Sequence, residues 1–288
     1  MKKLSPFVLD KRCKTCFERS YNHLFKKFDV NASQQSIFKV YFEEVFHDNP
    51  TLSAPEIQSL LNGFFCQLIA TEDPFEQEKT DSNRLALNLY KEWKSKVLQA
   101  KDPFDMALRL SVAGNVMDYG AANQFDVRQT IDKVLQASFA INHVKKLQQA
   151  IEKAKKIVYL GDNAGVIVSD KLFLEIINHP QIVYVVKASP VLNDVTYDDA
   201  KAVGMDKVAS ILSNGDNIPS TLLHRVSPEF LEHYRTADVI ISKGQGNLEG
   251  LIGEKDTRIY FLLMAKCDVI AELLKVEKGS FIVCNQKK

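Results

Sequence analysis

The sequence predicts an α/β protein with a mostly parallel sheet, and three apolar runs carry that prediction. Each run is short, continuous and rich in β-branched residues, as strands buried on both faces of a parallel sheet are. Helical patterns separate the runs, which is the order that places helices on both faces of one sheet. The runs lie at residues 156–161, 182–187 and 238–242.

The first half of the chain shows helical patterns almost throughout. Ser53 with Pro55 and Glu56 forms a capping-box pattern at a helix start. Phe38 and Phe42 are two of several aromatic residues that recur at helical spacing. Such a stripe is how a helix buries one side. We therefore expect these aromatic side chains to form a helical core and not a ligand site.

A long helix is predicted over residues 77–99, which contain no proline or glycine and carry Leu89 and Trp93 at helical spacing. Pro103 either ends this helix or starts the next one, which runs towards Gly114. Proline fits the first turn of a helix because the amide hydrogen it lacks has no partner there.

A third helical stretch is expected from residue 126 to about residue 155. Its lysine-rich end is typical of a solvated helix C-terminus. The predicted organisation is a mainly helical region, residues 1–155, packed on a Rossmann-like three-layer αβα domain, residues 156–288, that carries the functional site.

Polar clusters follow each of the three apolar runs. In an open parallel sheet, ligands bind beyond the carboxyl ends of the strands, where several loops converge. A single Asp or Asn at such a place often caps the next helix. Three clusters at equivalent positions instead predict one active site. They are Asp162-Asn163, Asn193-Asp194 and the stretch Lys243, Gly244, Gln245, Gly246 and Asn247.

The chemistry of these groups indicates phosphoryl transfer. Carboxylate and amide oxygens favour hard or borderline divalent ions such as magnesium or manganese, and no His or Cys stands beside them to suggest zinc. Lys243 on a glycine-rich loop combines a positive charge with exposed backbone N–H groups, which is a phosphate-binding arrangement. The six histidines are dispersed, so a nucleophilic triad is not expected.

These clusters occur with further motifs along nearly the whole chain. The motifs are Gly161 to Gly165, Asn193-Asp194, Lys243 to Asn247 with Glu249, Gly114 to Gly120, Cys13 with Cys16, Asp102-Pro103, and the segment from Tyr260 to Cys267. Together they resemble the damage-control phosphatase family, formerly domain of unknown function 89. The pair Cys13 and Cys16 is similar to that of a small prokaryotic subgroup.

The resemblance implies a metal-dependent phosphatase acting on small phosphorylated metabolites such as sugar phosphates. A divalent ion (Mn, Ni, Co or Mg) would be held by Asp162, Asn163 and Asp194. The phosphate would be held by Lys243 and by Gly244, Gln245, Gly246 and Asn247, while Asn193 would orient substrate or metal.

The resemblance implies that Asn115 and Asp118 reach the site from the helical region. Their spacing of three would place both on one helical face or turn. For Asn115 alone, ending the helix is the simpler interpretation. Two attacking groups are open: water deprotonated by a carboxylate such as Asp118, or Asp162 as a covalent nucleophile. The predicted catalytic residues are Asp162, Asp118 and Lys243.

The sequence departs from the family pattern in two places. Val166 stands where the family usually has Glu, and Ser220 stands where a glycine is usual in the turn after Pro219. The loss of the acid motivates an alternative, a non-catalytic protein that binds a metal or a phosphorylated metabolite. A methyltransferase or a nicotinamide-dependent enzyme is a weaker alternative, because no Gly-x-Gly-x-x-Gly loop is present.

Whole-chain properties agree with an enzyme of small metabolites. The 288 residues carry a formal net charge of +1, which argues against nucleic acid or an anionic membrane as partner. The N-terminal residues lack a secretory apolar stretch, so a cytoplasmic location is expected. Five cysteines, an odd number, do not suggest a disulfide framework, and Cys13 and Cys16 make only half a zinc site. No oligomeric state is predicted.

Overall fold

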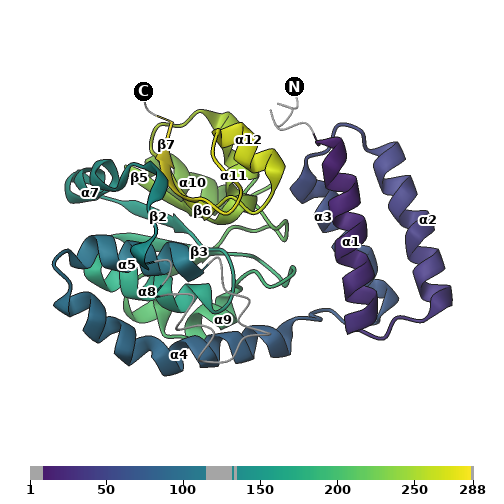
Figure 1. The fold of residues 1–288 in the computed structure, drawn as a ribbon, viewed down its shortest axis with the longest axis horizontal. Helices are drawn as coiled ribbons and strands as arrows, with labels where there is room; N and C mark the ends of the chain where they lie inside the picture. Colours follow the sequence, from purple (N-terminus) through teal and green to yellow (C-terminus); the bar gives the residue numbers. More distant parts are fainter. Residues whose placement is uncertain (1–8, 115–131, 133–134, 287–288) are drawn as a thin grey trace.

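The computed structural model describes residues 9–114, 132 and 135–286. Five helices come first: α1 (Lys11–Lys27), α2 (Ala32–Asp48), α3 (Ala54–Leu68), α4 (Glu76–Gln99) and α5 (Pro103–Gly114). The bounds of α4 and α5 confirm the long helix and the helix start at proline. In Figure 1, α1, α2 and α3 stand together at one side, and α4 runs from them beneath the rest of the chain.

Strands and helices alternate through the remaining part. They are β1 (Phe139–Asn142), α7 (Val144–Lys153), β2 (Ile157–Leu160), α8 (Val166–Ile177), β3 (Ile182–Val186), α9 (Tyr197–Ala202), β4 (Ser210–Ser213), α10 (Pro228–Thr236), β5 (Val239–Lys243), α11 (Gly244–Leu251), β6 (Ile259–Met264), α12 (Asp268–Leu274) and β7 (Phe281–Asn285), with short 3₁₀ turns at Met205–Lys207 and Ile252–Glu254. The three predicted strands are β2, β3 and β5.

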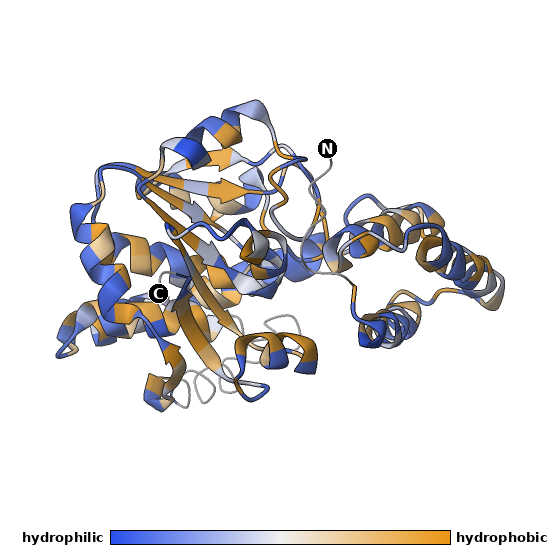
Figure 2. Cartoon of the chain, turned by 90° about the horizontal axis from the view of Figure 1, so that it is seen from above, coloured by the Kyte–Doolittle hydropathy of each residue, from blue (hydrophilic) through white to orange (hydrophobic). Residues whose placement is uncertain are grey.

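One seven-stranded sheet contains all of these strands, in the order β1-β7-β6-β5-β2-β3-β4. Every neighbouring pair is parallel except β6 with β7. Alternate strand residues face two separate cores, one beneath α4, α5, α7, α8 and α9 and one beneath α10, α11 and α12. The predicted α/β class with a mostly parallel, three-layer arrangement is therefore confirmed, and Figure 2 shows the apolar strands between helices of mixed hydropathy.

Of the helical stretch expected from residue 126 to about residue 155, residues 126–131, 133 and 134 lie outside the described residues, and the expectation is wrong in part for the rest. Residues 139–142 form strand β1, which pairs in parallel with β7 at the sheet edge. Its residues alternate between half-buried and exposed, a period of two that four residues are too few to reveal in the sequence. The predicted boundary at residue 155 stays a prediction, although β1 and α7 belong to the sheet layers.

The first three helices have a core of their own. It is built from aromatic side chains, including Tyr21, Phe25, Phe38 and Phe65, whose rings contact one another edge-on or tilted. The capping box at the start of α3 is present as predicted. Within the described residues, no helix is long and apolar enough to cross a membrane.

Candidate active site

The carboxyl ends of β2, β3, β5 and β6 meet at one edge of the sheet, since these strands are parallel to one another. The loop after β2 and the loop after β3 are held together there by backbone hydrogen bonds. Asn163 and Asp194 form an isolated antiparallel bridge. The amide of Ala164 donates to the carbonyl of Asn193 over 3.0 Å, and the amide of Val195 donates to the carbonyl of Asp162 over 2.9 Å.

This bridge brings together the three residues predicted to bind metal. Asp194 is 6% exposed. Burial raises the pKa of its carboxyl to about 7, against the opposing effect of Lys187, and the nearby Asp162 adds to the rise. Burial likewise raises the pKa of Asp162. Burial disfavours the ionised form of both carboxyl groups. A cation bound by the two carboxylates would stabilise that form.

The donor set fits a hard divalent ion. Asp162, Asn163 and Asp194 offer two carboxylates and one amide, all oxygen ligands of the kind that magnesium and manganese take. Among residues 9–114, 132 and 135–286, no three His, Cys, Asp or Glu side chains are placed to hold a metal ion together. A bound ion would therefore depend on Asn163 as well as on the two acids.

Lys243 lies deeper than the sequence suggests. It is the last residue of β5, and the residues after it start helix α11, so the expectation of a glycine-rich loop is wrong. Its side chain is fully buried, 3.1 Å from Asp170 and 3.0 Å from the hydroxyl of Ser111, and it also donates to the Ser111 carbonyl. An ammonium has three protons to donate, and these partners account for all three.

Asp170 organises this buried network and was not predicted. One carboxylate oxygen accepts a hydrogen bond from Ser111 over 2.8 Å, and the other accepts one from Tyr184 over 3.2 Å. Tyr159 lies 3.1 Å from the same Ser111 hydroxyl. The signal in the sequence was an acid one helical turn after Val166, near the start of a largely apolar helix.

Two glycines of α11 are explained by close approach of other groups. Gly244 has φ +82°, and a Cβ there would overlap the carboxylate of Asp162. A Cβ on Gly246 would overlap the carbonyl of Pro219. These positions lack side chains so that the β2 loop and the turn at Pro219 can pack directly on the first turn of α11.

The amide side chains of α11 hold neighbouring segments in place. Asn247 donates to the carbonyls of Gly161 and Lys243 over 3.0 and 2.8 Å and accepts from the hydroxyl of Thr221 over 2.8 Å. Gln245 donates to Glu249 over 2.9 Å. The predicted contact of these two amides with substrate stays a prediction, and the structure gives both of them partners inside the protein.

The two departures from the family pattern are both accommodated. Ser220 has no left-handed φ, and its hydroxyl donates to the Gly246 carbonyl over 2.7 Å. Val166 is 1% exposed and packs on Gly114, where a Cβ would come within 2.9 Å of the valine Cγ1. Asn115, which directly follows Gly114, and Asp118 lie outside the described residues.

Lys187, directly after β3, is a second buried lysine and was not predicted as a site residue. Its ammonium lies 3.6 Å from Asp194 and donates to the carbonyl of Ser220. Burial lowers its pKa, and Asp194 and Asp162 oppose that change. The signal available was its place as the one charged residue in the apolar run 182–187.

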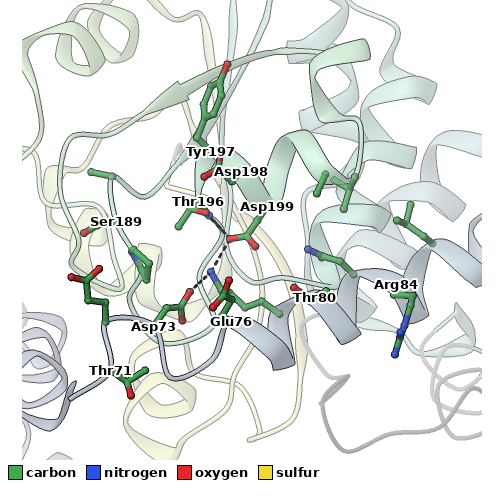
Figure 3. A pocket seen from close by; sticks show the side chains of 18 of the residues that line it. Thr71, Asp73, Glu76, Thr80, Arg84, Ser189, Thr196, Tyr197, Asp198 and Asp199 are labelled. Atoms are coloured by element: carbon green, nitrogen blue, oxygen red, sulfur yellow. Dashed lines mark hydrogen bonds and ion pairs between the residues drawn. The ribbon is translucent and has the colours of Figure 1, made fainter. Parts of the chain in front are cut away.

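One cavity of about 930 Å³ lies between α4 and the connection from β3 to α9. Figure 3 shows its acidic lining, in which Asp73 and Asp199 both point to one lysine ammonium. That ammonium belongs to buried Lys79, 2.9 Å from each acid. With Glu72, Glu76 and Asp198 also in the lining, this cavity is unsuited to an anion.

A second cavity, of about 390 Å³, lies where α1 and α3 face α11 and α12. Its lining carries four cations, Arg12, Arg19, Lys266 and Lys278, and two acids, Glu249 and Asp268. Arg12 joins the two sides through 2.7 Å contacts with both oxygens of Glu272. Of these two cavities, the second therefore has the charge that suits a phosphorylated molecule.

Three free thiols also line the second cavity: Cys13, Cys16 and Cys267. Burial raises the pKa of Cys13 to about 11, so this thiol is protonated at neutral pH. A protonated thiol is a poor nucleophile and a poor metal ligand. The structure adds no catalytic role for the Cys13 and Cys16 pair.

Glu249 makes the stability of the protein depend on pH. Burial raises the pKa of its carboxyl to about 7, above the unfolded value of 4.5. Its contribution to folding is fully present below pH 4.5 and is lost as the pH rises through about 7. We expect Glu249→Gln to raise the free energy of unfolding by roughly 1–3 kcal/mol at pH 8 and to change it little at pH 4.5.

Urea unfolding of both forms at the two pH values measures this difference, with the exposed Glu229→Gln as the matched control. An equal effect of Glu249→Gln at both values would show that the carboxyl ionises normally in the folded protein.

Comparisons with known proteins agree with this fold. Residues 9–282 match the family model of the damage-control phosphatase ARMT1-like domain. A damage-control phosphatase of Pyrococcus horikoshii is 35% identical over 226 residues, 77% of each chain. One of Archaeoglobus fulgidus is 30% identical over 223 residues, covering 75% of this chain and 77% of its own.

A crystal structure is similar over nearly the full length. It is that of a DUF89 family protein from Pyrococcus horikoshii, which aligns with a TM-score of 0.88 at 28% identity and covers 96% of this chain and 99% of its own. In an open α/β fold, ligands bind at the carboxyl edge of the parallel sheet, which is where the polar residues of this chain gather. This chain belongs to the ARMT1-like damage-control phosphatase family.

Proposed function

We propose that this protein is a metal-dependent phosphatase that hydrolyses monoesters of small phosphorylated metabolites, such as sugar phosphates. One observation carries the proposal: the bridge between Asn163 and Asp194 places two carboxyl groups with raised pKa values beside each other at the ligand-binding edge of the sheet. The names of the archaeal relatives support the reaction class. The second cavity, whose lining has more cations than acids, supports a small anionic substrate.

Asp162, Asn163 and Asp194 would hold the divalent ion (Mn, Ni, Co or Mg), which when bound supplies charge neutralisation and polarisation of phosphoryl oxygens. The protein keeps these ligands in place without it. Lys187 holds the carboxylate of Asp194, and Asn247 holds the carbonyl of Gly161 next to Asp162. Such preorganisation lowers the cost of assembling charge around the reacting phosphoryl group.

We propose two candidates for the group that attacks phosphorus. Asp162 could attack phosphorus as the ester P–O bond breaks and the alcohol leaves, with water then hydrolysing the acyl phosphate, or a carboxylate such as Asp118 could take the proton from a water that attacks as the alcohol leaves. In either case Lys243 acts through its buried position, as a positive charge that favours the ionised form of Asp162. We propose this role for Lys243 in place of direct contact with phosphate.

Phosphate release from a panel of sugar phosphates and an aryl phosphate, with manganese, nickel, cobalt or magnesium, tests the function. We expect release to require added metal and to fall by at least about a hundredfold in Asp162→Asn, which keeps the shape of the side chain and removes its charge. Asp198→Asn, an exposed acid on α9, is the matched control and should retain activity.

The opposite outcome has a defined meaning. Metal binding without phosphate release, for every metal and substrate tried, would contradict catalysis. It would favour the non-catalytic metal or phosphometabolite-binding protein that the presence of Val166 suggests.

A further inference from the structure

Helix α4 presents two buried polar side chains to the loops that carry the proposed metal ligands. Lys79 and Asn83 are only 3% and 6% exposed. They stand four residues apart, so they lie on the same face of the helix. Polar side chains of an amphipathic helix normally face solvent, so the burial of these two indicates a specific role.

Asn83 holds the loop after β2. Its side-chain oxygen accepts a hydrogen bond over 2.7 Å from the amide of Gly165. Gly165 has φ +77° and is the N-cap residue of α8, where an amide finds no acceptor within the helix. Asp162 and Asn163 lie three and two positions before it. The contact therefore fixes the far end of the short loop that begins with these two ligands.

Lys79 holds the loop after β3 through an acid of α9. Its ammonium lies 2.9 Å from a carboxylate oxygen of Asp199. The same oxygen accepts hydrogen bonds from the amide and the hydroxyl of Thr196, over 2.9 and 2.7 Å. Figure 3 shows these contacts from Thr196 to the lysine ammonium. Because Thr196 lies two positions after Asp194, they fix the loop that carries this third ligand.

The two contacts act on loops that are already joined to each other. The bridge between Asn163 and Asp194 joins the loops at the ligands, and α4 holds both from the side. Asp73, in the connection from α3 to α4, lies 2.9 Å from the Lys79 ammonium and helps to keep it in place. Metal ligands must meet an ion at distances defined to within about 0.2 Å, so contacts that fix the surrounding loops control affinity.

We propose that α4 is the helix that positions the metal site, with Asn83 and Lys79 as its positioning residues. Asn83 sets the loop of Asp162 and Asn163. Lys79 sets the loop of Asp194. Both act through the protein and are assigned no contact with metal or substrate. The assignment rests on the metal site of the proposed phosphatase.

Manganese binding to the substrate-free protein, measured by isothermal titration calorimetry, tests the role of Asn83. Asn83→Leu keeps a similar volume and removes the acceptor oxygen, and we expect it to bind manganese at least about tenfold more weakly. Asn83→Asp keeps an acceptor for the Gly165 amide and should restore most of the affinity. Adding Thr80→Asp, at an exposed position of α4, to Asn83→Leu supplies an equal charge without that acceptor and should restore none.

Lys79→Met tests the second contact by the same measurement. Removing a positive charge does not by itself weaken the binding of a cation. We nevertheless expect at least about tenfold weaker manganese binding, because the loop of Asp194 loses its support. Thr196→Val is a milder change that removes only the hydroxyl contact with Asp199, and it should weaken manganese binding by a smaller factor.

Val97→Ala is the matched control for stability. Val97 is a fully buried core residue of the same helix. Shortening its side chain should lower the urea midpoint, as Asn83→Leu does, and leave manganese affinity unchanged.

The outcomes separate this assignment from the phosphatase. Unchanged manganese affinity in Asn83→Leu or in Lys79→Met, equal weakening in Val97→Ala, or no manganese binding by the unaltered protein would each overturn the assignment. Manganese binding that depends on both residues, in a protein that releases phosphate from no substrate, would keep the assignment and reject the phosphatase.

Discussion

Asp170→Ala is expected to lower the free energy of unfolding by about 3–5 kcal/mol, because it leaves a buried lysine without its counter-ion. Lys243 and Asp170 both have no exposed side-chain surface and lie 3.1 Å apart. Removing one partner of such a pair destabilises a protein far more than replacing the whole pair by apolar residues does. The change also removes the carboxylate that accepts hydrogen bonds from Tyr184 and Ser111.

Urea unfolding of Asp170→Ala, Lys243→Met and the double variant measures the pair. The double variant should be more stable than Asp170→Ala alone, since no unpaired charge remains inside the protein. Asp206→Ala, at an exposed acid, is the control and should change stability by less than about 0.5 kcal/mol. If Asp170→Ala lowered the free energy of unfolding by less than about 0.5 kcal/mol, Ser111 alone would be a sufficient partner for the Lys243 ammonium.

Local patterns predicted the parts of the fold whose signals are local. Strands β2, β3 and β5 are buried on both faces, so each is a continuous apolar run. Because their carboxyl ends share one edge, the polar residues after them could be grouped without knowing the strand order. That grouping correctly anticipated that Asn163 and Asp194 are neighbours.

Contacts between distant segments could not be predicted in this way. Ser111 is 132 positions from Lys243, and only the packing of α5 on α8 brings it to the end of β5. Lys266 and Lys187 look alike in the sequence, as single lysines near apolar runs, yet one is exposed and the other buried. Which lysine remains available to a ligand depends on these tertiary contacts.

Gly244→Ala tests the glycine-rich segment after Lys243, which was predicted as a loop and is the start of helix α11. We expect a loss of about 1–3 kcal/mol in the free energy of unfolding, because alanine is strained at φ +82°. The new Cβ would also overlap the Asp162 carboxylate and displace it. Manganese affinity should therefore fall together with stability, and phosphate release should fall by at least about a hundredfold.

Gly63→Ala is the matched control, because Gly63 lies in helix α3 and a Cβ there would meet nothing within 4 Å. It should leave metal binding unchanged and stabilise the protein by roughly 0.5–1 kcal/mol, since alanine favours a helix over glycine. Unchanged manganese affinity in Gly244→Ala would show that metal binding by Asp162 does not depend on the close approach of its carboxylate to Gly244. The glycine would then serve the backbone turn from β5 into α11 alone.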